Sequence, residues 1–172
     1  VGPVDGPELL GAVSPPPGAD PGQPLSIAVS ARNIGTRSTT VAIVARVYLS
    51  TDTTITPGTD TFLGQVTLPV VPARDVRTAT LATSLPSMLM PGRYRIGAIV
   101  DATNLVREAT EANNTALSGE FLVGPDVEVA VTAPGSTGPS EPISVPVVIT
   151  SRGSPVISTL YRMYLSADPI LD

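Results

Sequence analysis

The chain has 172 residues, of which 42% are hydrophobic and only 15% charged, and its net charge is −5. This balance is too apolar for a disordered protein, and the 15 Gly and 19 Pro predict a folded chain with many turns. The ten basic residues are all Arg and are scattered singly, which argues against binding to nucleic acid or to an anionic membrane surface. No apolar run reaches the ~20 residues of a membrane span, so we predict no direct membrane insertion.

The residue types that are missing narrow the available chemistry. His, Cys, Trp and Lys are all absent, which removes the usual general base, the thiolate nucleophile, the Schiff-base amine and the soft metal ligands. Carboxylates and hydroxyls remain, and they suit a hard cation such as Ca²⁺ or a carboxylate-pair glycosidase. Sugar binding or hydrolysis usually needs aromatic platforms, and only four Tyr and two Phe are present. We therefore predict no enzyme and no cofactor, with Ca²⁺ left open.

Segments in which every second residue is apolar predict half-buried antiparallel strands. They cover 24–33, 40–50 and 93–101. The side chains predicted to face the core are Leu25, Ile27, Val29 and Ala31 in the first, Val41, Ile43, Ala45, Val47 and Leu49 in the second, and Tyr94, Ile96, Ala98 and Val100 in the third. Those predicted to point the other way in the second and third are Arg46, Tyr48, Ser50, Arg93 and Arg95.

Turn-forming segments rich in Pro, Gly, Asn and Ser separate these strands. They lie at 14–22, 33–38, 56–60 and 90–93. Several short strands between such turns predict an all-β sandwich. A Pro-Gly turn that leads directly into Tyr94 resembles the tyrosine corner of immunoglobulin-like folds.

The segment 50–60 is the weaker of two candidate cation loops. It carries Asp52, Thr54, Thr56 and Asp60, but it departs from the EF-hand pattern and lacks the bidentate Glu at the twelfth position. A type II turn at Pro57-Gly58 between two strands accounts for the segment without any ion.

The segment 101–114 is the stronger candidate. Its polar residues are Asp101, Asn104, Glu108, Glu111, Asn113 and Asn114. Carboxylate and amide oxygens of Asp101, Asn104, Glu108, Glu111 and Asn113 could supply the six to eight oxygens that Ca²⁺ prefers. The alternative is structural: Asp101 and Asn104 bond nearby backbone amides as turn caps, and Glu and Asn side chains tie the loop to the end of the sandwich. Residues 104–114 read either as a polar loop or as a helix of at most two turns.

Three sequence blocks recur in the same order, which indicates an internal repeat. The recurrences are 6–13 at 124–131, 25–35 at 143–153, both at an offset of 118, and 45–52 at 161–168, at an offset of 116. The predicted division is an N-terminal extension at 1–6, one complete sandwich at 7–123, and the first half of a second copy at 124–172.

The second copy lacks counterparts of several strands of the first, including the one that contains Tyr94. A half sandwich exposes strand edges that natural proteins avoid. We therefore expect either that the chain continues beyond Asp172 or that another molecule supplies the missing strands.

The residues named so far resemble the CARDB domain, the cell-adhesion-related domain found in bacteria. The matching features are Asn33 and Gly35, the run Tyr48–Ser50 with Asp52, the pair Leu63-Gly64 after Asp60, the segment 91–94, and the closing motif of Asp101, Asn104, Val106, Glu108, Glu111, Asn113 and Asn114. The resemblance covers 7–123 in full and 125–172 in part. It implies an immunoglobulin-like antiparallel β-sandwich that occurs in tandem on secreted or surface-anchored prokaryotic proteins.

We therefore predict a non-catalytic structural and adhesive module, located outside the cell or on its surface, that acts as a rigid spacer. Its expected partners are other proteins or further repeats of the same chain. One alternative is a Ca²⁺-dependent ligand-binding module. Another is a subunit of a surface filament, a homopolymer or larger assembly completed by strand exchange.

Overall fold

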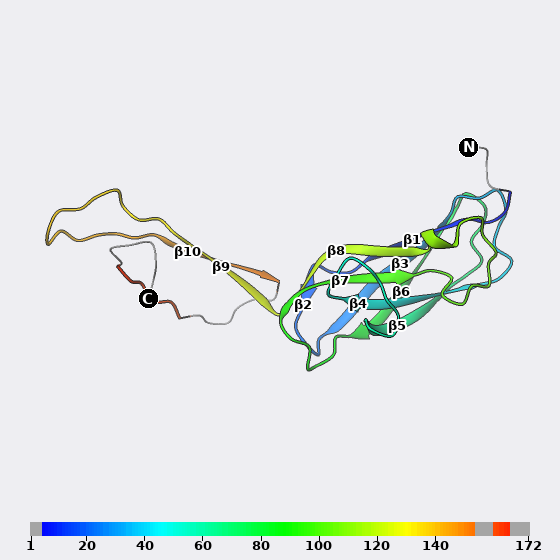
Figure 1. The fold of residues 1–172 in the computed structure, drawn as a ribbon, viewed down its shortest axis with the longest axis horizontal. Helices are drawn as coiled ribbons and strands as arrows, with labels where there is room; N and C mark the ends of the chain where they lie inside the picture. Colours follow the sequence, from blue (N-terminus) through cyan, green and yellow to red (C-terminus); the bar gives the residue numbers. More distant parts are fainter. Residues whose placement is uncertain (1–4, 154–159, 166–172) are drawn as a thin grey trace.

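The computed structural model describes residues 5–153 and 160–165, which form an almost entirely β structure (Figure 1). The strands of the sandwich are β1 (Leu9–Ser14), β2 (Gly18–Ala19), β3 (Pro24–Asn33), β4 (Ile43–Ser50), β5 (Thr61–Leu68), β6 (Val76–Ser84), β7 (Gly92–Ile99) and β8 (Thr115–Val123). One 3-10 turn, η1 (Glu111–Asn113), precedes β8, and a hairpin of β9 (Pro125–Val131) and β10 (Val147–Gly153) follows it. No described helix is long and apolar enough to cross a membrane.

Two sheets form the sandwich. One has the strand order β1-β3-β6 and the other β2-β8-β7-β4-β5. All pairings are antiparallel except the short one between β2 and β8, where Gly18 and Ala19 lie beside Leu122 and Val123 in parallel. The prediction of an all-β, immunoglobulin-like sandwich is confirmed, with this two-residue parallel contact as its one departure from antiparallel pairing among the described strands of the sandwich.

The core lies between the inner faces of these sheets, where the period-two pattern placed it. Leu25, Ile27, Val29 and Ala31 of β3 are all buried. They face the buried residues Ile43, Ala45, Val47 and Leu49 of β4 and Ile96 and Ala98 of β7, with Val100 just beyond. The placement of Val41 in this set was wrong: β4 begins two residues later, and Val41 is 39% exposed.

The outer face of the five-stranded sheet differs from the sequence-based expectation. Tyr48 and Ser50 point away from the core as predicted, yet both are buried. The loop between β4 and β5 covers this face and packs Ile55 onto Gly97 of β7, where any Cβ would collide with the Ile55 side chain. The alternation predicted the direction of Tyr48 correctly but could not reveal the loop that covers it.

Tyr94 forms the predicted tyrosine corner. Its hydroxyl donates a hydrogen bond to the carbonyl of Met90 (2.9 Å), four residues upstream. This bond fixes the turn before β7 against the start of that strand.

The hairpin of β9 and β10 leaves the sandwich at the end of β8 (Figure 1). Its register repeats that of β1 and β3 at the predicted offset of 118 residues. The pair Leu9–Asn33 corresponds to Val127–Ser151, and the pair Val13–Val29 corresponds to Val131–Val147. The division of the chain into a full and a partial copy stays a prediction, and this register agrees with it.

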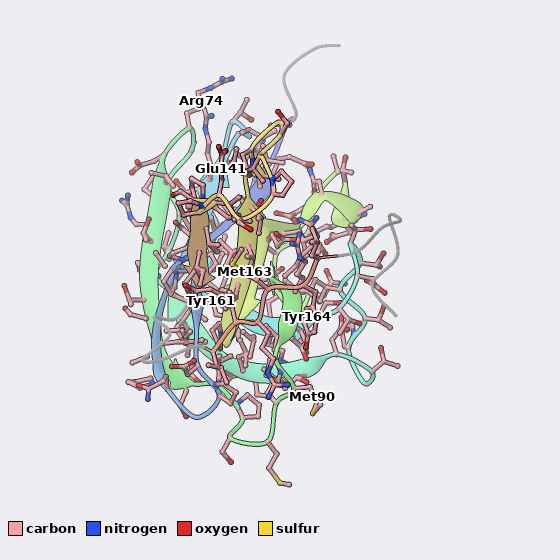
Figure 2. All side chains as sticks on the ribbon, turned by 90° about the vertical axis from the view of Figure 1, so that its left-hand side faces the viewer. Arg74, Met90, Glu141, Tyr161, Met163 and Tyr164 are labelled. Atoms are coloured by element: carbon pink, nitrogen blue, oxygen red, sulfur yellow. The ribbon has the colours of Figure 1, made fainter. Side chains whose placement is uncertain are left out.

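One face of the hairpin is apolar and largely uncovered. Val127, Val129 and Val131 are 40%, 51% and 56% exposed. Residues 160–165 have no regular secondary structure, and Figure 2 shows Tyr161, Met163 and Tyr164 on this segment. These residues fall in the third recurring block, whose positions 166–168 lie outside the described residues, as do 1–4 and 154–159.

Candidate functional site

Asp101 closes a tight turn directly after β7. Its backbone is left-handed (φ 48°), and its carbonyl accepts a hydrogen bond from the backbone N–H of Asn104 (2.7 Å), which is also left-handed (φ 52°). The carboxylate accepts bonds from the backbone N–H groups of Leu105 (3.1 Å) and Val106 (2.7 Å). Both carboxylate oxygens of this buried residue are therefore used as a turn cap, which is the structural alternative weighed for this loop.

Glu108 ties the same loop to the first strand. One carboxylate oxygen accepts from the backbone N–H of Leu9 (2.8 Å), and the other accepts from the side-chain amide of Asn114 (2.6 Å). Glu111 in turn accepts from the backbone N–H of Glu108 (3.0 Å). Burial raises the pKa of Glu108 to about 7, and the nearby negative charges of Glu111 and Glu8 act in the same direction, against the two hydrogen bonds.

Glu8 joins this cluster from the other side, and sequence reasoning did not single it out. It is 2% exposed, and one of its carboxylate oxygens accepts from the backbone N–H groups of Ala109 (2.9 Å) and Thr110 (3.2 Å). The other oxygen accepts from the side-chain amide of Asn113 (2.8 Å). About a hundred residues separate Glu8 from these partners, so no local pattern could have linked them.

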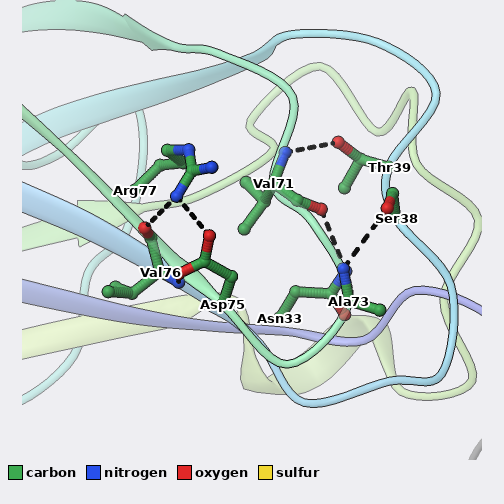
Figure 3. Close-up of polar contacts among 8 residues, drawn as sticks. All are labelled: Asn33, Ser38, Thr39, Val71, Ala73, Asp75, Val76 and Arg77. Carbon is green, nitrogen blue, oxygen red and sulfur yellow. Dashed lines mark hydrogen bonds and ion pairs between the residues drawn. The ribbon is translucent and has the colours of Figure 1, made fainter.

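Asn33 anchors a second polar network at the end of β3 (Figure 3). Its side-chain oxygen accepts from the backbone N–H groups of Glu8 (3.1 Å) and Gly35 (3.0 Å). Its amide donates to the carbonyls of Arg37 (2.7 Å) and Val71 (3.1 Å). One buried side chain thus satisfies four backbone groups from three segments of the chain.

Further contacts hold the loop between β5 and β6, which contains Val71. The backbone N–H of Val71 donates to the Thr39 hydroxyl (3.0 Å), and that of Ala73 donates to Ser38 (3.3 Å). Arg77 pairs with the carboxylate of Asp75. The backbone hydrogen bond to Asp75 and its contact with Arg77 lower the pKa of that carboxyl, as expected for a charged group used in a turn.

The structure brings only part of the predicted Ca²⁺ set together. Glu111 bonds the backbone of Glu108, and Asn113 bonds Glu8, whereas Asp101 caps its own turn. The side chain of Asn104 makes no hydrogen bond to another described residue. Two amide oxygens, those of Asn113 and Asn114, are buried without a hydrogen-bond partner. Within residues 5–153 and 160–165, no group of three or more His, Cys, Asp or Glu side chains is arranged to hold a metal ion. The Ca²⁺ site stays a prediction.

The loop between β4 and β5 also uses its acidic side chains internally. Asp52 accepts from the backbone N–H of Thr54 (2.7 Å), and Asp60 accepts from that of Thr56 (2.7 Å). Gly58 takes the left-handed conformation (φ 99°) that the predicted turn needs. These bonds describe a stiff turn rather than an open ring of oxygen ligands.

Comparison with known proteins identifies the domain. The family model of CARDB matches residues 8–118, and the chain belongs to this family. A CARDB domain from Pyrococcus furiosus, solved as a crystal structure in complex with di-metal ions, superimposes with a TM-score of 0.55 at 22% identity, over 72% of this chain and 94% of that one. A solution structure of the same domain gives a TM-score of 0.52 at 25% identity, over 69% and 96%. No curated protein matches the sequence.

Membership of the CARDB family, together with a sandwich whose polar residues tie loops to strands, supports a structural module of surface proteins. The acidic motif that identifies the family serves here to fasten the loop 101–114 to the start of β1.

Proposed function

We propose that this protein is a rigid, non-catalytic spacer on the cell surface or outside the cell, built from CARDB sandwiches in tandem. The observation that carries the proposal is the pairing of β9 with β10 in the register of β1 with β3, each position 118 residues further along. A chain that starts the same sandwich twice is organised as an array, and arrays of this kind hold distant parts of a protein apart.

The joint between the two units supports the rigid form of this proposal. Only Gly124 separates β8 from β9, and its N–H donates to the carbonyl of Ala19 (3.1 Å). Its backbone is left-handed (φ 74°), and a Cβ there would lie 3.1 Å from the ring of Pro91. Pro125 follows directly, with a restricted φ. A joint with so few rotatable bonds resists bending.

Small-angle X-ray scattering tests the rigidity. A variant with a short Gly-Ser insertion after Gly124 serves as the flexible reference, because such linkers behave as random coil. We expect the unmodified protein to give a narrower distribution of interatomic distances than the insertion variant. Equal breadth in the two proteins would contradict a rigid spacer.

A Ca²⁺-dependent module is the second candidate, and the partnerless amide oxygens of Asn113 and Asn114 favour it. The amide nitrogens of the same two side chains donate to the carboxylates of Glu8 and Glu108, so amide and carboxylate oxygens, both of which suit Ca²⁺, occur in one cluster. The complex of the Pyrococcus furiosus domain with di-metal ions adds support. Calorimetry with Ca²⁺ tests it: binding heat that disappears in Asn113→Ala supports the site, and no heat at millimolar ion contradicts it.

A surface assembly is the third candidate, favoured by the uncovered apolar face of the hairpin. Strands from a neighbouring copy would bury that face and pair the open edges. Sedimentation velocity over a range of concentrations tests this idea. Growth into larger species supports the assembly, and a constant monomer supports the spacer.

A further inference from the structure

A groove lies on the outer face of the five-stranded sheet, at its edge strand β5. It has a volume of about 410 Å³, within the range of small-molecule sites. The residues that line it are Arg46, Tyr48, Gly58, Asp60, Phe62 and Gln65. None of these residues takes part in the polar clusters around Glu8 and Asn33, so the groove needs its own explanation.

The strand register gathers the floor of this groove. Arg46 lies directly opposite Gln65, and Tyr48 lies opposite Phe62, on the neighbouring strands β4 and β5. A bulge between Val47 and Tyr48 keeps both pairs on the outer face although the residue spacing differs on the two strands. The result is a patch of two aromatic and two polar side chains on one surface.

Phe62 gives the groove an exposed aromatic surface. It is 53% exposed, whereas Tyr48 beneath it is only 5% exposed. Their ring centroids are 5.5 Å apart with the planes tilted by 57°, a favourable arrangement for an aromatic pair. The buried Tyr48 therefore fixes the position of Phe62 and leaves part of that ring open to solvent.

The polar side chains around this ring keep free hydrogen-bonding capacity. Neither Arg46 nor Gln65 makes a side-chain hydrogen bond or ion pair with another described residue. Asp60 uses one carboxylate oxygen to hold Thr56 and has the other available. The groove thus offers guanidinium and amide donors together with amide and carboxylate acceptors.

The rim of the groove is held in place before any ligand arrives. The Asp60 bond to Thr56 (2.7 Å) and the bond from Thr59 N–H to the Thr56 carbonyl (3.2 Å) close the turn that contains Gly58. On the other side of the loop, the Ser50 hydroxyl donates to the carbonyl of Thr54 (3.1 Å). A preformed rim lowers the ordering cost of binding.

We propose that this groove binds a pyranose ring of a glycan, with Phe62 against the C–H face of the ring and Arg46, Gln65 and Asp60 bonding its hydroxyls. A sugar presents an apolar face surrounded by groups that both donate and accept hydrogen bonds, which is the arrangement of this surface. The inference goes beyond the spacer role, because a spacer needs no ligand. It would give the module an adhesive function of its own.

Saturation-transfer NMR on the full chain tests the proposal, with cellotetraose, chitotriose and trigalacturonic acid as separate probes and the tripeptide Ala-Ala-Phe as a peptide probe. At least one sugar should receive saturation, and Phe62→Ala should weaken its binding about tenfold or more. Val76→Ala is the matched control, because Val76 is a similarly exposed apolar residue (47%) on β6 of the other sheet. It should leave binding unchanged.

Three outcomes would overturn the proposal: no sugar receives saturation, sugar binding is unchanged in Phe62→Ala, or only the tripeptide binds. Thermal unfolding shows whether each variant is folded. If Phe62→Ala unfolds, the exposed Gln65→Ala decides in its place, with the same weakening expected. The scattering experiment on the joint is unaffected by any of these results, so failure here leaves the spacer proposal standing.

Discussion

The pair β1–β3 and the pair β9–β10 share one register but differ in what covers them. Leu9 is fully buried under the five-stranded sheet, whereas Val127, at the equivalent position, is 40% exposed. The antiparallel ladder forms in both places. Burial of the apolar side chains on that ladder depends on the opposite sheet, whose strands come from positions far along the chain.

The two strand pairs also differ in how closely another segment can pack against them. A Cβ on Gly11 of β1 would lie 2.9 Å from a methyl group of Val100 and 3.2 Å from the carbonyl of Asn114. The equivalent residue of β9 is Val129, with a much larger side chain. Any segment that packs over Val129 must therefore approach it less closely than Val100 and Asn114 approach Gly11.

The largest effect should come from truncating the matched residues Leu9 and Val127. Leu9→Ala removes a fully buried side chain and should lower the free energy of unfolding by about 2–5 kcal/mol. Val127→Ala removes an exposed one and should change it by less than about 0.5 kcal/mol. Urea unfolding measures both. Equal losses would mean that the hairpin face is buried in solution.

Asn33 provides the next comparison, because Ser151 occupies its place in the hairpin. Asn33→Ala leaves four backbone groups without their partner and should destabilise the sandwich by about 1–3 kcal/mol for a buried group left unsatisfied. Asn33→Ser should also destabilise it, since the shorter side chain cannot reach all four groups. Thermal unfolding measures the loss. A neutral Asn33→Ser would show that the hub is dispensable.

Glu108 makes the stability of the sandwich depend on pH. Its pKa of about 7 in the folded state exceeds the ordinary value of 4.5, so the folded state holds a proton that the unfolded chain has released. The stability that this proton adds is fully present below about pH 4.5 and is lost as the pH rises through about 7.

Urea midpoints measured across this pH range test that prediction. Glu108→Gln cannot titrate, and its profile should lack the decline between about pH 4.5 and 7. Glu141→Gln, in the connection between β9 and β10, should keep the decline of the unmodified protein. An unchanged profile in Glu108→Gln would assign the pH dependence to another group.

The smallest effect should come from an exposed ion pair on the sheet surface. Arg93 and Glu120 are 3.1 Å apart, with side chains 66% and 46% exposed. Glu120→Gln should change the free energy of unfolding by less than about 1 kcal/mol, and the difference should shrink as salt is added. A larger loss in thermal unfolding would place this pair among the contacts that hold the sandwich together.

Much of the fold follows from the sequence, because the relevant signals are local. Alternation alone identifies the buried face of β3, and a Pro-Gly turn before Tyr94 identifies the corner. The burial of Tyr48 escapes such reasoning, since it depends on Ile55 meeting Gly97, which lies on β7, the third strand further along the chain.

The polar cluster shows the same limit. Segment 101–114 is conspicuous for its carboxylates, but Glu108 accepts a hydrogen bond from the backbone of Leu9, and the backbone of Ala109 donates to the carboxylate of the distant Glu8. Nothing in the local pattern distinguishes a carboxylate that accepts bonds from a distant strand from one that binds an ion. The groove beside Phe62 was missed for a related reason, because the low aromatic count hides the fact that two rings meet.

The course of β1 has a mechanical consequence. β1 begins at the end of the sandwich remote from Val123, because its far end leads into β2, which lies beside the last residues of β8. A pull applied at Glu8 and at Val123 therefore acts along β1 and strains the hydrogen bonds between β1 and β3 together instead of one after another. The bonds of Leu9 and Glu8 to loop 101–114 would be loaded in the same moment, so they would resist stretching together with the β1–β3 ladder.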